Sequence, residues 1–372
     1  MKKPINNLPV HGGEIERLAR EYGFAVEELL DFSANINPAP PPESVLERLK
    51  KDVQNIALLT RYPDLELSEL RGVLAKHCGV QNSNIVIANG SAALIDATIR
   101  AVLPRKCLLP VPAFSEYARA LRAFGCQIQQ FPLSREQNFV LDVEKFNREL
   151  ESGEFDFCII NNPHNPTGAM ILRQNLEKLI RVAELKNVTV LLDEAFIDYQ
   201  PDESLTKFAD KYTNLIVMRS VTKFFSIPAL RVGYAVTDEI LAERLNEQIS
   251  SWSVTTFAAN AVCEVFKDED FSTLVREQNE VEKNRFGLLL REIGLKVYPS
   301  SANFLLLELR GKHLNAAILF ERLIINHKII VRNCSSYDNL GDKFLRVAVR
   351  TKPENELFIV AVSECLKFHR SS

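Results

Sequence analysis

The stretch Ser-Val-Thr-Lys-Phe-Phe-Ser-Ile-Pro-Ala-Leu-Arg, residues 220–231, places Lys223 between the hydroxyls of Ser220 and Thr222. A lysine amine attacks a carbonyl carbon only when its surroundings keep it partly neutral. Hydroxyls together with an arginine, here Arg231, bind a phosphate monoester, because a guanidinium grips phosphate at two points. Pyridoxal phosphate needs both features, since it carries an aldehyde and a phosphate on one ring. Taken alone, the segment is also consistent with a solvated lysine and a structural arginine.

A second motif, Asn-Asn-Pro-His-Asn-Pro-Thr-Gly at residues 161–168, follows the apolar run 155–160. This pattern is typical of a buried strand that enters a turn. A further strand, expected over residues 188–192, ends at Asp193. Ligands of open α/β sheets bind beyond the carboxyl ends of the strands, so both turns are expected at one site. Asp193 would keep the cofactor's pyridine nitrogen protonated, as the electron sink requires, and Asn165 would donate to the ring hydroxyl.

A third turn, residues 89–93, joins a strand to a helix expected over residues 92–102. The free N–H groups of a helix N-terminus attract anions. Gly90, Ser91 and Ala92 are therefore predicted to bind the cofactor phosphate together with Ser220 and Arg231, and Ser91 can cap the helix at the same time.

Buried apolar runs alternate with helical patterns along most of the chain, which predicts an α/β fold with a mostly parallel sheet covered on both faces. Strands are expected at residues 85–88, 107–110, 127–131, 155–160, 188–192, 215–219 and 232–236, and one of the intervening helices at 175–186. After residue 255 the pattern changes to one long helix, 257–293, followed by strands at 296–298, 304–309, 329–331 and 344–349. These elements suggest a smaller α+β domain with an antiparallel sheet.

Composition limits the classes of function. The 372 residues suffice for two domains, and 46 % hydrophobic with 25 % charged residues is ordinary for a globular protein. A net charge of −3 argues against a dedicated nucleic-acid binder, and no apolar run approaches the ~20 residues of a membrane span. Seven dispersed cysteines without CxxC spacing favour a reduced, cytoplasmic protein without a metal site, and the first residues do not resemble a signal peptide.

Over essentially its whole length the chain resembles the fold-type I pyridoxal phosphate enzymes of the class I/II aminotransferase superfamily. It is similar to the histidinol-phosphate aminotransferase branch, and most similar to the threonine-phosphate decarboxylases of cobalamin biosynthesis. The most specific motifs are His-Gly-Gly at residues 11–13 and Asp-Phe-Ser-Ala-Asn-Ile-Asn-Pro at 31–38. Further matches lie at residues 61–64, 193–198, 222–224, 252–254, 332–334 and 346–350, whereas the Asn-Pro-Thr-Gly and lysine motifs are common to many aminotransferases.

The resemblance implies a large domain (39–256) with a seven-stranded sheet, a smaller C-terminal domain (257–372), and an N-terminal arm (1–38) that packs on the small domain. It also implies that Phe114, with Tyr117 as the competing candidate, stacks on the cofactor ring. Tyr62 would reach the cofactor phosphate of a neighbouring subunit, which makes the enzyme an obligate homodimer with shared active sites.

The resemblance further implies a substrate pocket made of His11, Gly12, Asn35, Asn165, Arg332 and Arg346. Two arginines suit a substrate that carries both a carboxylate and a phosphate. The expected activity is decarboxylation of an O-phospho-amino acid, namely L-threonine O-3-phosphate, without nucleic-acid or membrane partners. Phosphoserine as substrate and a histidinol-phosphate-type aminotransferase using 2-oxoglutarate remain alternatives. Phe196 counts against the aminotransferase, because such enzymes usually place a tyrosine there.

Overall fold

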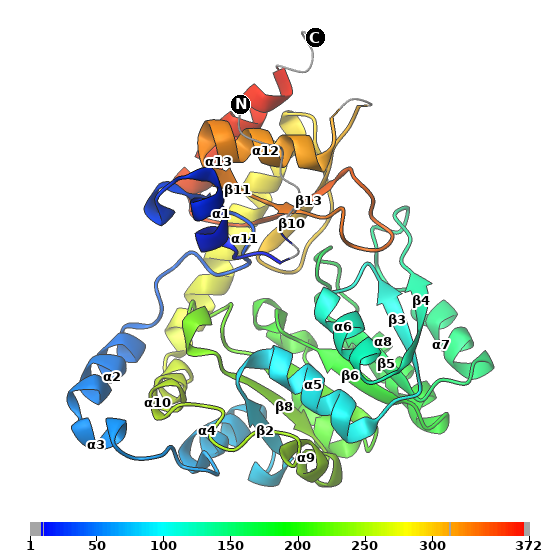
Figure 1. Ribbon diagram of the computed structural model, residues 1–372. Helices are drawn as coiled ribbons and strands as arrows, with labels where there is room; N and C mark the ends of the chain where they lie inside the picture. Colours follow the sequence, from blue (N-terminus) through cyan, green and yellow to red (C-terminus); the bar gives the residue numbers. More distant parts are fainter. Residues whose placement is uncertain (1–8, 10, 312–313, 368–372) are drawn as a thin grey trace. The chain divides into compact units, whose positions relative to one another are not determined.

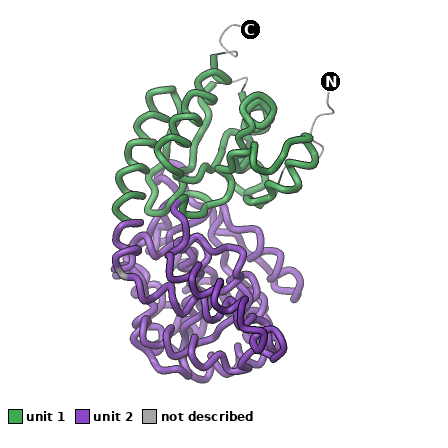
Figure 2. Tube along the Cα trace, turned by 90° about the vertical axis from the view of Figure 1, so that its left-hand side faces the viewer, with its two compact units in different colours: residues 1–38, 166–168, 276–372 green, residues 39–165, 169–275 purple. Residues whose placement is uncertain are grey.

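The computed structural model describes residues 9, 11–311 and 314–367. Contacts within the chain divide it into two compact units, which Figure 2 shows in separate colours. Unit 2 consists of residues 39–165 and 169–275, and unit 1 of residues 1–38, 166–168 and 276–372. The boundary between the two units falls after residue 275, beyond the predicted domain limit at residue 256. The helix at 256–265 belongs to unit 2 because it packs against the helices at 43–54 and 68–78. The domain limits 39–256 and 257–372 remain a prediction about the folding domains.

Unit 2 is built on a seven-stranded sheet with the order β2-β8-β7-β6-β5-β3-β4 (Figure 1). All neighbouring strands are parallel except for the two pairs that β8 makes, with β2 and with β7. The central strands are buried along their whole length, which explains their continuous apolar sequences. The predicted α/β fold with a mostly parallel seven-stranded sheet is thus confirmed. The strands are β2 (Ile85–Ala88), β3 (Lys106–Val111), β4 (Gln127–Pro132), β5 (Phe157–Asn161), β6 (Thr189–Asp193), β7 (Leu215–Ser220) and β8 (Gly233–Thr237).

Helices cover this sheet on both faces. Three of them share one apolar core with it, namely α5 (Gly90–Val102), α6 (Ser115–Ala123) and α9 (Glu239–Asn246). Figure 1 shows α5 and α6 in front of the sheet, and α8 (Arg173–Leu185) packs against β6 from the other side. The other helices of unit 2 are α2 (Glu43–Gln54), α3 (Ile56–Leu59), α4 (Ser68–Cys78), α7 (Val143–Ser152) and α10 (Thr256–Val265). Short 3-10 helices lie at Asn82–Asn84, Ile197–Tyr199, Pro201–Glu203, Thr206–Lys211 and Pro228–Leu230.

The register of the strands brings the predicted cofactor residues to one edge of the sheet. Asn161 at the end of β5 pairs with Asp193 at the end of β6. Ser220, which ends β7, pairs with Gly233, and Gly233 in turn pairs with Ala88 at the end of β2. The turns that follow β2, β5, β6 and β7 therefore start from one edge, where α/β sheets bind ligands.

Unit 1 contains a four-stranded antiparallel sheet with the order β12-β13-β10-β9 and a parallel pair, β1-β11. Helices α1, α12 and α13 and the C-terminal part of α11 share a second apolar core with these strands. The strands are β1 (Leu30–Asp31), β9 (Lys296–Val297), β10 (Phe304–Glu308), β11 (Ile329–Ile330), β12 (Arg332–Asn333) and β13 (Phe344–Ala348). The helices are α1 (Ile15–Tyr22), α11 (Glu269–Glu292) from residue 276 onward, α12 (Ala316–His327), α13 (Lys352–Lys367) and a 3-10 helix at Val26–Glu28.

Three expectations about these elements were wrong in detail. The single helix expected over residues 257–293 is two helices, because Asp268 accepts a hydrogen bond from the backbone N–H of Phe271 at 2.8 Å and starts α11 anew. The strand expected at 329–331 is not part of the antiparallel sheet; it pairs in parallel with β1. The helix expected from residue 92 begins at Gly90, so Ser91 lies inside its first turn.

Within the described residues, none of the helices combines the length and the apolar character that crossing a membrane requires.

Candidate active site

Lys223 lies three residues after the end of β7 and within hydrogen-bonding distance of one of the two hydroxyls predicted around it, that of Ser220. Its Nζ donates to Oγ of Ser220 at 3.0 Å, and Thr222 joins the group through Ser220, whose Oγ lies 2.8 Å from Oγ1 of Thr222. Burial lowers the pKa of Lys223 to about 8. The negative charge of Asp193 acts in the opposite direction, whereas the positive charge of Arg231 lowers this pKa further. A lysine with this pKa is partly neutral near neutral pH, so it can attack an aldehyde.

Asp193 ends β6 and is buried. Its Oδ1 accepts a hydrogen bond from the backbone N–H of Ala195 at 2.9 Å, and its Oδ2 accepts one from the hydroxyl of Tyr117 at 2.5 Å. Burial raises the pKa of Asp193, whereas these two hydrogen bonds and the charge of Lys223 act in the opposite direction. The structure thus brings the predicted lysine and carboxylate into one electrostatic environment.

Asn165 lies in the turn after β5, and this turn is tied to β6. Nδ2 of Asn161 donates to the carbonyl of Asp193 at 2.9 Å, and Oδ1 of Asn161 accepts from the backbone N–H of Asn165 at 2.7 Å. Burial lowers the pKa of His164 to about 4, with a hydrogen bond to the backbone of Pro112 acting against it. His164 is therefore neutral at physiological pH and joins this turn to the one before α6.

Two glycines, one in the turn predicted to bind phosphate and one at the start of β8, leave little room for a side chain. Gly90 has a φ of +79°, and a Cβ there would lie 2.6 Å from Nη2 of Arg231. A Cβ on Gly233 would lie 2.6 Å from the backbone nitrogen of Ser91. Because both positions lack side chains, the guanidinium and the first turn of α5 come together as a phosphate site requires. Ala92 lies in the same turn.

The two aromatic candidates for stacking have different environments. Tyr117 is buried and its hydroxyl binds Asp193, whereas Phe114 precedes the first residue of α6 and keeps partial exposure. The two rings meet edge to face with their centroids 5.6 Å apart. Phe114 is therefore the candidate for stacking on the cofactor. The hydrogen bond between Tyr117 and Asp193 was not predicted, although Tyr117 lies only three residues after Phe114, the predicted stacking ring.

A buried ion cluster, also missed, lies directly behind Asp193 and Ser220. Arg219 donates to Oδ1 of Asp198 at 2.6 Å, and its Nη1 lies 3.7 Å from Oε2 of Glu194. Glu194 follows Asp193, and Arg219 precedes Ser220, so strand alternation is the signal that could have revealed the cluster. These contacts join β6 to β7 where both strands present their functional residues.

Unit 1 carries the two arginines predicted to bind substrate. Arg332 and Arg346 pair across β12 and β13, and both are buried. Arg346 lies in the middle of β13. Burial lowers the pKa of Arg346, and the like charge of Arg332 lowers it further. Two buried guanidiniums on paired strands are a candidate site for anions.

Backbone and hydroxyl oxygens orient both guanidiniums. Arg332 donates to the carbonyl of Pro9 at 2.8 Å and to Oγ of Ser336 at 2.9 Å, and it lies 4.9 Å from the ring centroid of Tyr337. Arg346 donates to the carbonyl of Ser33 at 2.7 Å. The directions of both forks are therefore set by surrounding groups.

The N-terminal residues of the expected substrate pocket lie in the same unit. A Cβ on Gly12 would lie 2.0 Å from the carbonyl oxygen of Ser33 and 3.1 Å from Nη2 of Arg346, so only glycine fits there. His11, beside it, is exposed. Asn35 is buried, and its Oδ1 has no hydrogen-bond partner among the described residues, as expected of a group that awaits a ligand.

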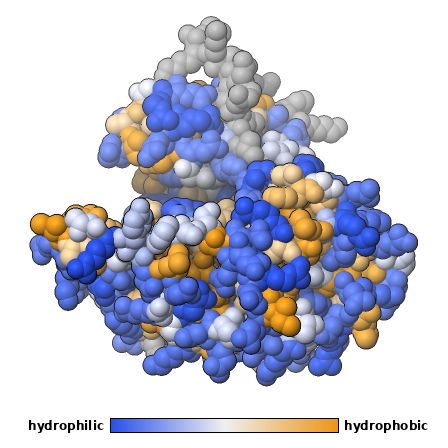
Figure 3. Space-filling view, turned by 60° about the horizontal axis from the view of Figure 1, so that its bottom comes forward, coloured by the Kyte–Doolittle hydropathy of each residue, from blue (hydrophilic) through white to orange (hydrophobic). Residues whose placement is uncertain are grey.

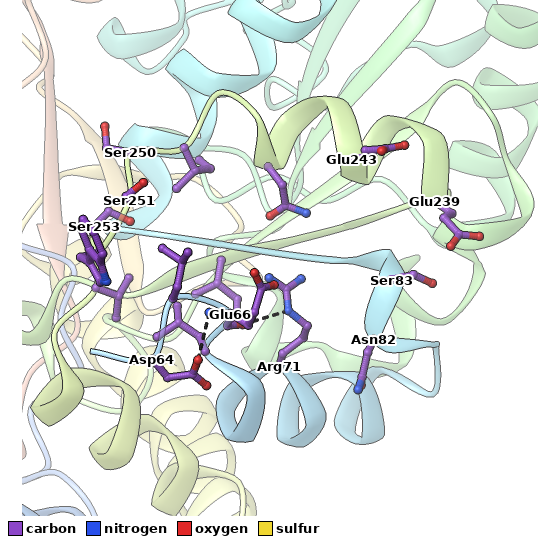
Figure 4. Close-up of a pocket in the computed structure, with 17 residues that line it drawn as sticks. Asp64, Glu66, Arg71, Asn82, Ser83, Glu239, Glu243, Ser250, Ser251 and Ser253 are labelled. Carbon is purple, nitrogen blue, oxygen red and sulfur yellow. Dashed lines mark hydrogen bonds between the residues drawn. The ribbon is translucent and has the colours of Figure 1, made fainter. Parts of the chain in front are cut away.

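Tyr62 is 79 % exposed in the loop before α4, and its ring contacts that of Trp252 with centroids 4.8 Å apart. Next to Trp252 lies a hollow of about 620 Å³ between α4, α9 and residues 249–254 (Figure 4). In its wall Asp64 accepts from the backbone N–H of Glu66, and Arg71 donates to the carbonyl of Glu66. None of the predicted site residues lines this hollow, so the cofactor residues lie elsewhere.

The residues of unit 2 fit pyridoxal phosphate. A partly neutral lysine, a buried carboxylate, and a helix N-terminus that receives an arginine through two glycines match its aldehyde, its ring nitrogen and its phosphate. The positions of the other predicted residues are compatible with the same group, and their roles remain predictions.

Comparisons with known proteins agree with this chemistry. The aminotransferase class I and II family matches residues 27–362. The chain is 33 % identical to the threonine-phosphate decarboxylase of Salmonella typhimurium over 96 % of both chains. Among solved structures, a decarboxylase from Sulfurospirillum multivorans is 28 % identical, with a TM-score of 0.84 and coverage of 98 % of this chain and 94 % of that one. The histidinol-phosphate aminotransferase from Clostridium acetobutylicum is 29 % identical, with a TM-score of 0.83 and coverage of 90 % and 98 %.

Proposed function

The chain belongs to the aminotransferase class I and II family, and on that premise we propose that it is a pyridoxal-phosphate-dependent decarboxylase of an O-phospho-amino acid. The proposed substrate is L-threonine O-3-phosphate, and the products are CO2 and (R)-1-aminopropan-2-yl phosphate for the nucleotide loop of cobalamin. The observation that carries the proposal is the buried pair Arg332 and Arg346. One guanidinium binds the carboxylate and the other binds the phosphate.

Each cofactor residue of unit 2 has a defined task. The amine of Lys223 would hold the cofactor through its aldehyde and would exchange protons with the substrate. Asp193 keeps the ring nitrogen protonated, Asn165 donates to the ring hydroxyl, and Phe114 stacks on the ring. When bound, the cofactor supplies an electron-withdrawing ring that accepts the electron pair of the broken bond.

The phosphate of the cofactor needs its own set of donors. We assign it to the first turn of α5, with Gly90, Ser91 and Ala92, to the side chain of Arg231, and to the hydroxyls of Ser220 and Thr222. The close approach of Arg231 to Gly90 supports this assignment. Lys223 donates to Ser220, so the phosphate site and the nucleophile share one hydroxyl.

The charge of the substrate suits the arginine pair. A phosphomonoester carries about −1.5 to −2 charges at neutral pH, and the carboxylate adds another. Two guanidiniums balance most of that charge, and His11, Gly12 and Asn35 supply further contacts. Decarboxylation would follow if the substrate bound with its carboxylate perpendicular to the cofactor ring, and transamination would follow if its α-proton faced Lys223.

Phe196 supports decarboxylation as the outcome. It is buried at the start of the turn after β6, where related aminotransferases place a tyrosine. Phenylalanine cannot donate a hydrogen bond to the ring hydroxyl, so that oxygen depends on Asn165 alone. The ring hydroxyl of the cofactor would thus have one hydrogen-bond partner fewer than in an aminotransferase of this branch.

We also propose that the enzyme is a cytoplasmic homodimer in which Tyr62 contacts the cofactor phosphate of the partner. Exposed apolar side chains on α2 and α3 support an interface: Val53, Ile56 and Leu59 are each more than 60 % exposed. Such side chains gather over α2 and α3 at the left edge of Figure 3. Exposed apolar side chains on two neighbouring helices, together with the exposed Tyr62, are typical of a surface that a second subunit covers. All seven cysteines are free thiols, which fits a reducing compartment.

One experiment separates decarboxylation from transamination. Purified enzyme with pyridoxal phosphate is mixed with phosphothreonine, phosphoserine, threonine or histidinol phosphate, each with and without 2-oxoglutarate. We expect CO2 from phosphothreonine without any oxo acid, little from threonine, and none from the Lys223→Ala protein.

The alternative is a histidinol-phosphate aminotransferase, and the likeness to the Clostridium acetobutylicum enzyme favours it as the second candidate. The arginine pair would then also serve a dicarboxylate as amino donor or acceptor. Wild-type enzyme that releases no CO2 from any phospho-amino acid, yet converts histidinol phosphate when 2-oxoglutarate is present, would establish this alternative.

A further inference from the structure

The carboxylate that faces the cofactor nitrogen has a buried partner outside the motifs. The hydroxyl of Tyr117 donates to Oδ2 of Asp193 at 2.5 Å, and the backbone N–H of Ala195 donates to Oδ1 at 2.9 Å. Tyr117 comes from α6, whereas Asp193 and Ala195 lie at the end of β6 and just after it. Both carboxylate oxygens are thus held, and one of them depends on a single side chain.

The helix that carries Tyr117 directly follows the predicted stacking ring. Phe114 and Tyr117 lie three residues apart and contact each other edge to face. One turn of chain therefore presents an aromatic ring for the cofactor face and a phenol for the carboxylate. The ion cluster of Arg219 fixes β6 from behind, so Tyr117 and that cluster bracket the segment that contains Asp193.

We propose that Tyr117 is a positioning residue that holds Asp193 ionised and aimed at the cofactor nitrogen, a role that rests on the proposed use of pyridoxal phosphate. Asp193 and the ring nitrogen compete for one proton. The phenol hydrogen bond stabilises the ionised carboxylate and leaves the proton on the nitrogen. Without that bond, burial favours the neutral carboxyl, so the proton moves to Asp193 and the ring loses electron-withdrawing power.

The test is Tyr117→Phe, which removes one oxygen and keeps the ring. Protein loaded with pyridoxal phosphate labelled with nitrogen-15 in the ring is studied by NMR without substrate, and its absorbance is followed against pH. We expect the ring nitrogen to shift towards the unprotonated state. We also expect kcat to fall by roughly tenfold to a hundredfold, with KM little changed, because a hydrogen bond to a charged group is lost.

Tyr199→Phe is the matched control. Tyr199 is also a buried tyrosine of unit 2, and its hydroxyl has no hydrogen-bond partner among the described residues. Its removal should leave the nitrogen signal and the pH titration unchanged. A second control is the double variant Tyr117→Phe with Asp193→Asn. If the tyrosine acts through Asp193, adding Tyr117→Phe to Asp193→Asn should change the nitrogen signal no further.

The outcomes distinguish this inference from the proposed function. Wild-type protein that binds no pyridoxal phosphate would overturn both. Normal cofactor binding with an unchanged nitrogen signal in Tyr117→Phe would overturn only the role of the tyrosine. That role is also overturned if Tyr117→Phe and Tyr199→Phe shift the signal equally, or if Tyr117→Phe still shifts it in the Asp193→Asn background. The readout contains no substrate, so it does not depend on which reaction the enzyme catalyses.

Discussion

Replacing Gly233 with alanine tests whether the N-terminus of α5 binds the cofactor phosphate. Gly233 opens β8, and a Cβ there would lie 2.6 Å from the backbone nitrogen of Ser91 and 2.8 Å from the carbonyl carbon of Gly90. Both neighbours are backbone atoms, so no side chain can rotate away. The first turn of α5 or the start of β8 must therefore move by about 0.8 Å to restore an ordinary contact of 3.4 Å.

A shift of this size is large for a phosphate site. N–H groups bind oxygen over a narrow range of about 2.7–3.2 Å, so moving the turn takes at least one donor out of reach. A hydrogen bond to a charged group contributes about 1.5–3 kcal/mol. We therefore expect Gly233→Ala to weaken pyridoxal phosphate binding by about tenfold to a little over a hundredfold. The fold should persist, because the rest of β8 keeps its pairs with β2 and β7.

The assay is titration of the apoprotein with pyridoxal phosphate, followed by absorbance, beside a thermal unfolding curve. Gly287→Ala on α11 is the matched control, since its nearest neighbour would lie 3.5 Å away, an ordinary contact. This variant should keep the wild-type affinity and gain about 0.5–1 kcal/mol of stability from helix propensity. A folded Gly233→Ala protein whose Kd stays within about threefold of wild type would refute the assignment of the phosphate to this turn.

Further predictions concern the nucleophile, the substrate pocket and the interface. The rate of cofactor capture by the apoprotein should rise with pH and level off above about 8, because burial holds the pKa of Lys223 there; a stopped-flow rate that still rises towards the ordinary value of 10.5 would contradict this. Arg346→Ala should raise KM for phosphothreonine in the CO2 assay by roughly tenfold to a hundredfold, and an unchanged KM would exclude it from the pocket. Gly12→Ala should also raise KM, because its Cβ meets the carbonyl of Ser33, while cofactor binding stays normal. Ile56→Asp should give monomers in analytical ultracentrifugation, whereas Leu185→Asp, on an exposed residue of α8, should not; dimers in both would place the interface elsewhere.

The parallel sheet and the residues at its edge were predictable because their signals are local. Each central strand is buried on both faces, so it appears in the sequence as a continuous apolar run. The polar residue that ends such a run, as Asp193 ends β6, must then lie at the ligand edge of the sheet. The predicted strands consequently agree with the observed ones to within two residues at either end.

Other features depend on contacts between distant parts of the chain. β1 and β11 are two residues long and pair Leu30 with Ile329, so neither has enough length for a pattern of its own. The partner of Asp193 comes from a helix 76 residues earlier, and a tyrosine on that helix is equally suited to the core. The break before α11 depends on one capping aspartate, Asp268, within a long helical pattern. A single sequence contains no measure of which long-range pairs form.

The choice between decarboxylation and transamination also depends on contacts between distant parts of the chain. The cofactor residues of unit 2 belong to motifs that aminotransferases share, so they predict the cofactor and leave the outcome open. In the proposed function the guanidinium forks of unit 1 bind the substrate, and Arg332 takes its direction from the carbonyl of Pro9, the hydroxyl of Ser336 and the ring of Tyr337. These neighbours can change while the arginine stays, so the arginine alone does not encode the direction of its fork. The groups around Arg332, rather than the lysine or the aspartate, are therefore where decarboxylases and aminotransferases of this family should differ.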